Sequence, residues 1–134
     1  MARTGTVTLR ERHKIAFWKK AGRGFSGYPV ATVAFYGADD QVASKVSVGI
    51  IRTEGEEPFA LERWFSDTAD VRNDHDILEK VLQFVRAHGA KTVAMVDRII
   101  GCPHEEGTDY PEGTTCPRCP FWAHRDRWTG ETVR

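Results

Sequence analysis

Hydrophobic and polar residues alternate along three consecutive segments in the first half of the chain, and this alternation predicts β-strands. Residues 30–36 are β-branched and aromatic, while apolar and polar positions alternate along residues 42–51 and residues 59–65. Turn residues separate the segments, with Gly and Asp after the first and Gly and Pro after the second. Short connections of this kind join antiparallel neighbours, so the pattern predicts a three-stranded meander.

The second segment indicates which side of the strands faces a core. Val46, Val48 and Ile50 fall on one face of this strand, and Lys45 and Ser47 fall on the other. The apolar face therefore requires a covering layer.

The strongest helical pattern covers residues 74–88, where apolar residues recur every three or four positions. Asn73 or Asp74 can cap its first turn, and Gly89 is placed for a left-handed C-cap. The apolar stripe consists of Ile77, Leu78, Val81, Leu82, Phe84 and Val85. Residues 92–96 then read as a short buried strand that ends at Asp97. This order of elements predicts an α+β fold with the helix on one face of the sheet.

Composition is that of an ordinary globular protein, but the charges are unevenly placed. The 134 residues include 40% hydrophobic and 28% charged residues, with a formal net charge of zero. Residues 1–23 carry seven basic residues and one acidic residue, whereas residues 102–117 carry four acidic residues and no Lys or Arg. No apolar run has the length of a membrane span, and residues 1–5 lack the apolar core of a secretory signal. We therefore expect a cytoplasmic protein whose basic ends engage an anionic partner or its own acidic middle.

Three cysteines and a histidine lie close together near the C-terminus, in the pattern C-x-H-x11-C-x2-C. Cys102 and His104 form the first pair, and Cys116 and Cys119 form the second. Two turns that each offer two nitrogen or sulfur ligands are typical of a structural zinc site with tetrahedral coordination. His124, which follows the second pair, is the alternative fourth ligand. Four protein ligands would fill the coordination sphere of Zn²⁺ and leave no position for catalysis.

The C-P-R-C turn resembles that of the zinc-ribbon and zinc-knuckle class, in which a C-P-x-C turn pairs with a second two-ligand turn. Residues 102–111 read C-P-H-E-E-G-T-D-Y-P and are also similar to the tail of a family of small uncharacterised bacterial proteins. The resemblance covers the last quarter to third of the chain. It implies a bound zinc ion but no activity, and the chain departs from a standard ribbon in using C-x-H for its first turn.

These patterns divide the chain into three parts. We expect a basic N-terminal arm with a glycine-rich linker over residues 1–29, an α+β sheet domain over residues 30–101 and a zinc-binding segment over residues 102–134. Phe121 and Trp122 are placed to pack over the sulfur atoms and shield them.

A metal-dependent hydrolase or deaminase is one enzymatic alternative. His104 and Glu106 read as H-x-E, and the C-P-R-C turn reads as C-x-x-C, which are the two motifs of zinc deaminases. Thr115 stands where the deaminase motif has proline, and Cys102 would be a surplus thiolate at the metal. These departures favour a closed, non-catalytic site.

A second enzymatic alternative follows from topology, because the order of elements resembles the first half of ribonuclease H-like folds. Two-metal chemistry there would need clustered carboxylates. Asp97 falls at the end of the fourth predicted strand and Glu79 on the helix. The first strand contains no acidic residue, and Asp39 and Asp40 lie in the turn beyond it.

Aromatic and basic residues are mixed at both ends of the chain, a combination that suits single-stranded nucleic acid. The candidate nucleic-acid-binding residues are Arg10, Arg12, Lys14, Trp18, Lys19, Lys20, Arg125, Arg127 and Trp128. The same aromatic residues can instead dock on the body of the protein. We therefore expect a non-enzymatic zinc-binding protein that engages a macromolecule, with nucleic acid favoured over a protein-adaptor role. The sequence does not determine the oligomeric state.

Overall fold

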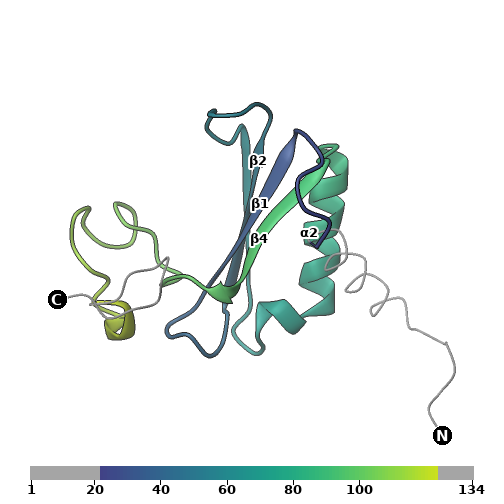
Figure 1. The fold of residues 1–134 in the computed structure, drawn as a ribbon. Helices are drawn as coiled ribbons and strands as arrows, with labels where there is room; N and C mark the ends of the chain where they lie inside the picture. The colour runs from purple at the N-terminus through teal and green to yellow at the C-terminus, as the bar shows by residue number, and fades with distance from the viewer. Residues whose placement is uncertain (1–21, 124–134) are drawn as a thin grey trace, which may run out of the picture.

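A computed structural model describes residues 22–123, in which a sheet and a helix form two layers (Figure 1). The elements are β1 (Val30–Tyr36), β2 (Lys45–Ile51), β3 (Ala60–Phe65), η1 (Val71–Asn73), α2 (His75–Ala87), β4 (Thr92–Ile99) and η2 (Pro120–Trp122). The helix α2 covers one face of the sheet, and the cysteine-containing segment extends from one end of it (Figure 1). The predicted α+β fold is confirmed.

The four strands are ordered β3-β2-β1-β4. Strand β2 pairs antiparallel with both β1 and β3, which confirms the predicted meander, and β4 pairs parallel with β1. A parallel partner is expected here, because α2 provides the crossover that a parallel connection needs.

The core lies between α2 and the facing side of the sheet. Val46, Val48 and Ile50 are fully buried there, as their alternation predicts. Burial of an aliphatic side chain of this kind contributes roughly 1.5–3 kcal/mol. The helix contributes Ile77, Leu78, Val81, Leu82 and Val85 to the buried residues. The face of the sheet opposite α2 is called the open face below.

Both ends of α2 are formed by the residues that the sequence suggests. The side chain of Asp74 accepts a hydrogen bond from the backbone N–H of Ile77 at 3.1 Å, so Asp74 is the N-cap, while Asn73 belongs to η1. Gly89 follows the helix with φ +64°, a left-handed conformation that glycine adopts without steric cost.

The last strand differs from its prediction in length and in burial. Strand β4 continues beyond Asp97 to Ile99, and its register with β1 shifts between Val33 and Phe35. Ala94 and Val96 are exposed, because β4 is an edge strand and α2 covers only one of its faces. The predicted fourth strand is therefore confirmed, but it is longer than expected and only one of its faces is buried.

Asp70 ties the start of β2 to the turn that precedes α2. Its carboxylate accepts hydrogen bonds from the backbone N–H of Ala43 at 3.1 Å and of Arg72 at 2.9 Å, and from the Arg72 guanidinium at 2.6 Å. Burial alone would raise the pKa of Asp70, but the bonds from Arg72 and Ala43 outweigh it and lower the pKa below its ordinary value.

Candidate metal centre

The first two cluster residues follow directly from the end of the sheet. Beyond β4, the backbone N–H of Ile100 donates to Phe35 O at 3.0 Å, and the N–H of Gly37 donates to Gly101 O at 2.9 Å. These bonds extend the pairing of β1 and β4 by one step, so Cys102 begins its turn from a fixed position.

The second pair of cysteines lies on a turn that returns to the same place. Cys119 N donates to Cys116 O at 3.4 Å, and Trp122 N donates to Cys119 O at 3.2 Å at the start of η2. The indole Nε1–H of Trp122 donates to Gly37 O at 2.8 Å. Gly37 thus contacts both halves of the cluster segment through its two backbone groups.

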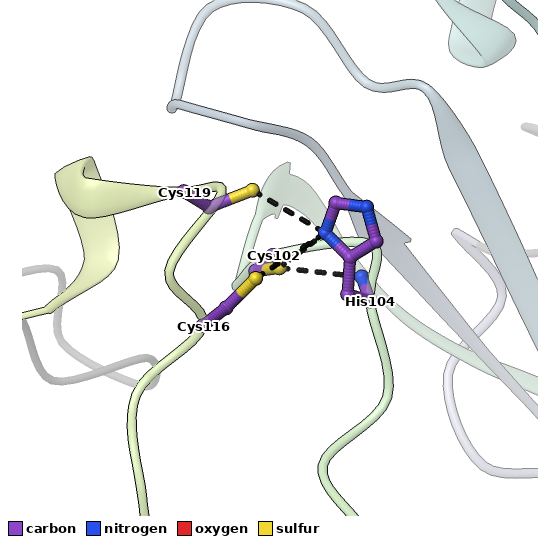
Figure 2. A group of neighbouring side chains, drawn as sticks. All are labelled: Cys102, His104, Cys116 and Cys119. Atoms are coloured by element: carbon purple, nitrogen blue, oxygen red, sulfur yellow. Dashed lines mark hydrogen bonds between the residues drawn. The ribbon is translucent and has the colours of Figure 1, made fainter. Parts of the chain in front are cut away.

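The four predicted ligands meet at one point (Figure 2). The Nδ1 atom of His104 lies 3.2 Å from the sulfur of Cys102, 3.4 Å from that of Cys116 and 3.5 Å from that of Cys119. All four ligand atoms lie within 4.8 Å of one another. Zn–S and Zn–N bonds at tetrahedral angles place nitrogen and sulfur about 3.6 Å apart. The cluster can therefore hold one metal ion, with Nδ1 as the histidine ligand.

The three thiols are buried and influence one another through hydrogen bonds. Burial raises the pKa of Cys102 to about 12, with further raising contributions from Cys119 and Cys116 and an opposing hydrogen bond from the His104 backbone. Burial also acts upward on Cys116, but hydrogen bonds with the Arg118 backbone and the other thiols outweigh it and lower its pKa. A metal ion that binds thiolates must displace these protons, so binding is expected to weaken as the pH falls.

The acidic loop between the two turns is stabilised by hydrogen bonds from its backbone N–H groups to its own carboxylate and carbonyl oxygens. Glu105 N donates to the Asp109 carboxylate at 2.7 Å, and Asp109 N donates to Glu105 O at the same distance. Gly113 N donates to the Glu106 carboxylate at 2.6 Å, and Gly107 has φ +82°. These carboxylates therefore shape the loop.

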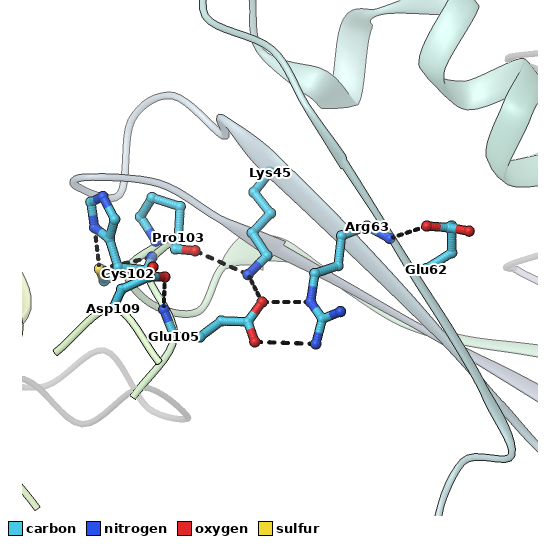
Figure 3. Close-up of polar contacts among 8 residues, drawn as sticks. Lys45, Glu62, Arg63, Cys102, Pro103, Glu105 and Asp109 are labelled. Carbon is cyan, nitrogen blue, oxygen red and sulfur yellow. Dashed lines mark hydrogen bonds and ion pairs between the residues drawn. The ribbon is translucent and has the colours of Figure 1, made fainter. Parts of the chain in front are cut away.

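Glu105 joins this loop to the open face of the sheet (Figure 3). Its carboxylate lies 3.2 Å from the ammonium nitrogen of Lys45 and accepts a hydrogen bond from Arg63 Nη2 at 3.2 Å, with a second contact to Arg63 Nε. Lys45 also donates to Pro103 O at 3.0 Å. Its nitrogen lies 5.1 Å from the ring centre of Tyr36 and 5.7 Å from that of Phe65. Sequence reasoning missed Lys45 and Arg63, because alternation gives only the face of a residue and not its distant partner.

Aromatic side chains cover the cysteines. Tyr110 and Trp122 pack against the three buried sulfurs, and Trp122 also contacts the main core. This confirms the expected packing of Trp122. Phe121 stacks edge-on against Trp122, with ring centres 4.9 Å apart.

Several candidate residues lie outside residues 22–123 and receive no structural test. They are His124 and the nucleic-acid-binding candidates Arg10, Arg12, Lys14, Trp18, Lys19, Lys20, Arg125, Arg127 and Trp128. The cluster formed with His104 already supplies four ligand atoms without His124.

Of the carboxylates named for two-metal chemistry, Asp39, Asp40 and Glu79 form no metal-binding group in the described part of the structure. Asp39 and Asp40 lie in the β1–β2 connection and accept hydrogen bonds from Gln41. Glu79 on α2 accepts from Gln83 Nε2 at 3.5 Å, and the side chain of Asp97 is outside the described part of the structure. Within the described part, the cysteine–histidine cluster is the one group of three or more such residues that could hold a metal ion.

Comparison with known proteins gives no match to any family model, curated protein or solved structure. Between residues 22 and 123, no helix combines the length and apolar character that crossing a bilayer requires.

Proposed function

We propose that this chain is a non-enzymatic protein whose cysteine–histidine cluster holds one structural Zn²⁺ ion. The observation that carries the proposal is the convergence of three sulfurs and His104 Nδ1 within 4.8 Å. Soft thiolate ligands in a tetrahedral set favour zinc over magnesium or calcium, which prefer oxygen. The free cysteines fit a reducing compartment such as the cytoplasm.

The proposed ion fastens a segment that has little apolar material of its own. Residues 102–119 contain mainly glycine, proline, threonine and acidic residues, and their backbone bonds are local turns. Such a segment cannot bury enough surface to hold its shape, so ion binding supplies the missing free energy. A closed coordination sphere of this type supports a zinc-ribbon-like or zinc-knuckle-like role rather than a hydrolase or deaminase.

Metal analysis of purified, reduced protein tests the proposal. We expect one zinc ion per chain in the unmodified protein and in His124→Ala. Cys116→Ser and His104→Ala are expected to lose most of it, because each removes one of the four ligands that would hold the ion in a structural site. If His104→Ala retains zinc and His124→Ala loses it, the fourth ligand is His124 and not His104.

We further propose that the chain engages a macromolecule, with single-stranded nucleic acid favoured. The support is the sequence of the two ends, where Trp18 and Trp128 stand among basic residues. Nucleic-acid binding should weaken steeply as salt increases, because phosphate contacts release counterions. A titration of labelled oligonucleotides at increasing salt tests this. Absence of binding would favour the protein-adaptor role.

A further inference from the structure

A cavity of about 380 Å³ lies between the open face of the sheet and the metal-binding segment. Its floor consists of small side chains on adjacent strands, namely Thr32, Ala34, Ser47 and Gly49. Thr32, Ala34 and Tyr36 line it along β1, and their span corresponds to a length of roughly 13 Å at the usual rise per residue. Cavities of this volume hold small molecules.

The two ends of the cavity differ in chemistry. Pro58 and Leu61 form an apolar end beside Gly49, where an added Cβ would lie 3.3 Å from the Pro58 ring. Lys45, Arg63, Glu105 and His104 form the polar end. A molecule that fits both ends has an apolar body and one polar head.

His104 offers a hydrogen-bond donor at the polar end. With Nδ1 directed to the three sulfurs, the second ring nitrogen, Nε2, points away from them (Figure 2) and carries the proton when Nδ1 binds metal. A metal-bound histidine almost always donates this N–H to an acceptor. No acceptor for it is found among residues 22–123, although His104 lines the cavity.

Arg63 offers further donors beside it. The guanidinium has five N–H groups, and Glu105 engages only two of its three nitrogen atoms. A second hollow also borders His104. Its lining includes the carboxylates of Asp67, Glu105 and Asp109 but no Lys or Arg side chain, so a molecule with a hydrogen-bond acceptor is disfavoured there.

The local charge decides which kind of acceptor fits. Lys45 and Arg63 balance Glu105 and Glu106 along the cavity wall. A divalent ion with three thiolates and a neutral imidazole carries a net charge of −1. An anionic head would therefore be repelled, while a neutral carbonyl can accept from His104 and Arg63 without adding charge.

We propose that this cavity binds a small neutral molecule with an apolar body and a carbonyl-type head, the head contacting the Nε2–H of His104 and the guanidinium of Arg63. The inference rests on the proposed function, because metal binding at Nδ1 fixes the proton on Nε2. Zinc thus keeps a structural role, while His104, which binds it, presents a hydrogen-bond donor to the small molecule.

Three benzene derivatives that differ only in the head test the proposal: benzamide is neutral, benzoate anionic and benzylamine cationic. Each is titrated into zinc-loaded, full-length, ¹⁵N-labelled protein and followed by NMR. Fragments of this size bind with Kd on the order of 1 mM. We expect benzamide to bind about tenfold more tightly than the other two. Its shifts should concentrate at Ala34, Ser47, Arg63 and the Nε2–H signal of His104.

A pair of matched variants locates the site. Ala34→Leu fills the floor and should weaken benzamide binding about tenfold. Ala94→Leu makes the same change at an exposed position of the open face that does not line the cavity, and it should bind as the unmodified protein does. Zinc content and circular dichroism establish that both variants are folded.

Any one of four results would overturn the inference. These are equal affinity for the three compounds, NMR shifts that do not saturate, shifts at residues away from the cavity, and undiminished binding of benzamide by Ala34→Leu. In zinc-loaded protein, each of these results leaves the proposed metal site intact. A chain that contains no stoichiometric zinc would instead overturn the proposed function and this inference with it.

Discussion

The ammonium group of Lys45 lies 3.2 Å from the carboxylate of Glu105, 60 residues away in the sequence. The lysine side chain is only 5% exposed, whereas that of Glu105 is 35% exposed. Because Glu105 follows His104 of the cysteine–histidine cluster, this ion pair connects the cluster segment to β2 at the start of the strand.

Replacing Glu105 by Gln should destabilise the protein, because buried Lys45 would lose its negatively charged partner. We expect the free energy of unfolding to fall by roughly 1–3 kcal/mol in urea titrations at neutral pH. The double variant Lys45→Met with Glu105→Gln should recover part of this loss, since it removes the unpaired charge. Glu57→Gln, on an exposed residue of the β2–β3 connection, is the control and should change stability by less than about 0.5 kcal/mol. Equal stability of Glu105→Gln and the control would show that the ion pair contributes nothing.

Asp70 should make stability depend on pH in the acidic range. Its pKa is lower in the folded protein than in the unfolded chain, so its contribution is complete above the unfolded pKa and is lost as the pH falls through the folded pKa. At pH 7, Asp70→Asn should reduce the free energy of unfolding by about 1–2 kcal/mol. The difference from the unmodified protein should shrink as the pH is lowered below about 4. Urea titrations at a series of pH values measure it, and a difference that stays constant with pH would contradict the assignment.

Gly37 should tolerate no side chain. A Cβ at this position would lie 2.2 Å from Val42 O, and the backbone of Gly37 also bonds Gly101 and Trp122. Gly37→Ala should therefore cost roughly 1–3 kcal/mol or more and weaken zinc retention, because the anchor of both ligand turns would move.

The same substitution at Gly55 provides the control. Gly55 has φ +80° and nothing within 4 Å of an added Cβ, so Gly55→Ala should cost only about 1 kcal/mol and leave zinc binding unchanged. Thermal unfolding and a competition assay with a zinc chelator measure the two effects. Equal zinc retention in the two variants would argue against Gly37 as the anchor.

Removal of zinc should loosen the metal-binding segment more than the sheet. The core between α2 and the strands is closed by apolar contacts that do not include the cysteines, apart from the shared contact of Trp122. Chelation should therefore increase hydrogen–deuterium exchange in residues 102–119 while the amides of β1 and β2 remain protected. Simultaneous loss of protection in both regions would mean that the ion holds the whole domain together.

The sequence predicts the parts of this protein that depend on local periodicity. Alternation along β2 places Val46, Val48 and Ile50 in the core, and the capping chemistry of Asp74 and Gly89 places the helix ends. The four cluster residues are also visible in sequence, since the spacing within each pair is a local property of its turn.

Contacts between distant segments are not visible in this way. Alternation assigns Lys45 to the face opposite the core, but that side chain is buried, because the loop after His104 folds over it. The exposure of Ala94 likewise depends on which strand lies at the edge of the sheet, and this is a property of the whole topology.

X-ray absorption at the zinc edge of the reduced, full-length protein tests the central claim most directly. The account predicts one zinc ion per chain with three sulfur ligands at about 2.3 Å and one nitrogen at about 2.0 Å. A protein without stoichiometric zinc, or a spectrum that requires an oxygen ligand from solvent, would contradict it.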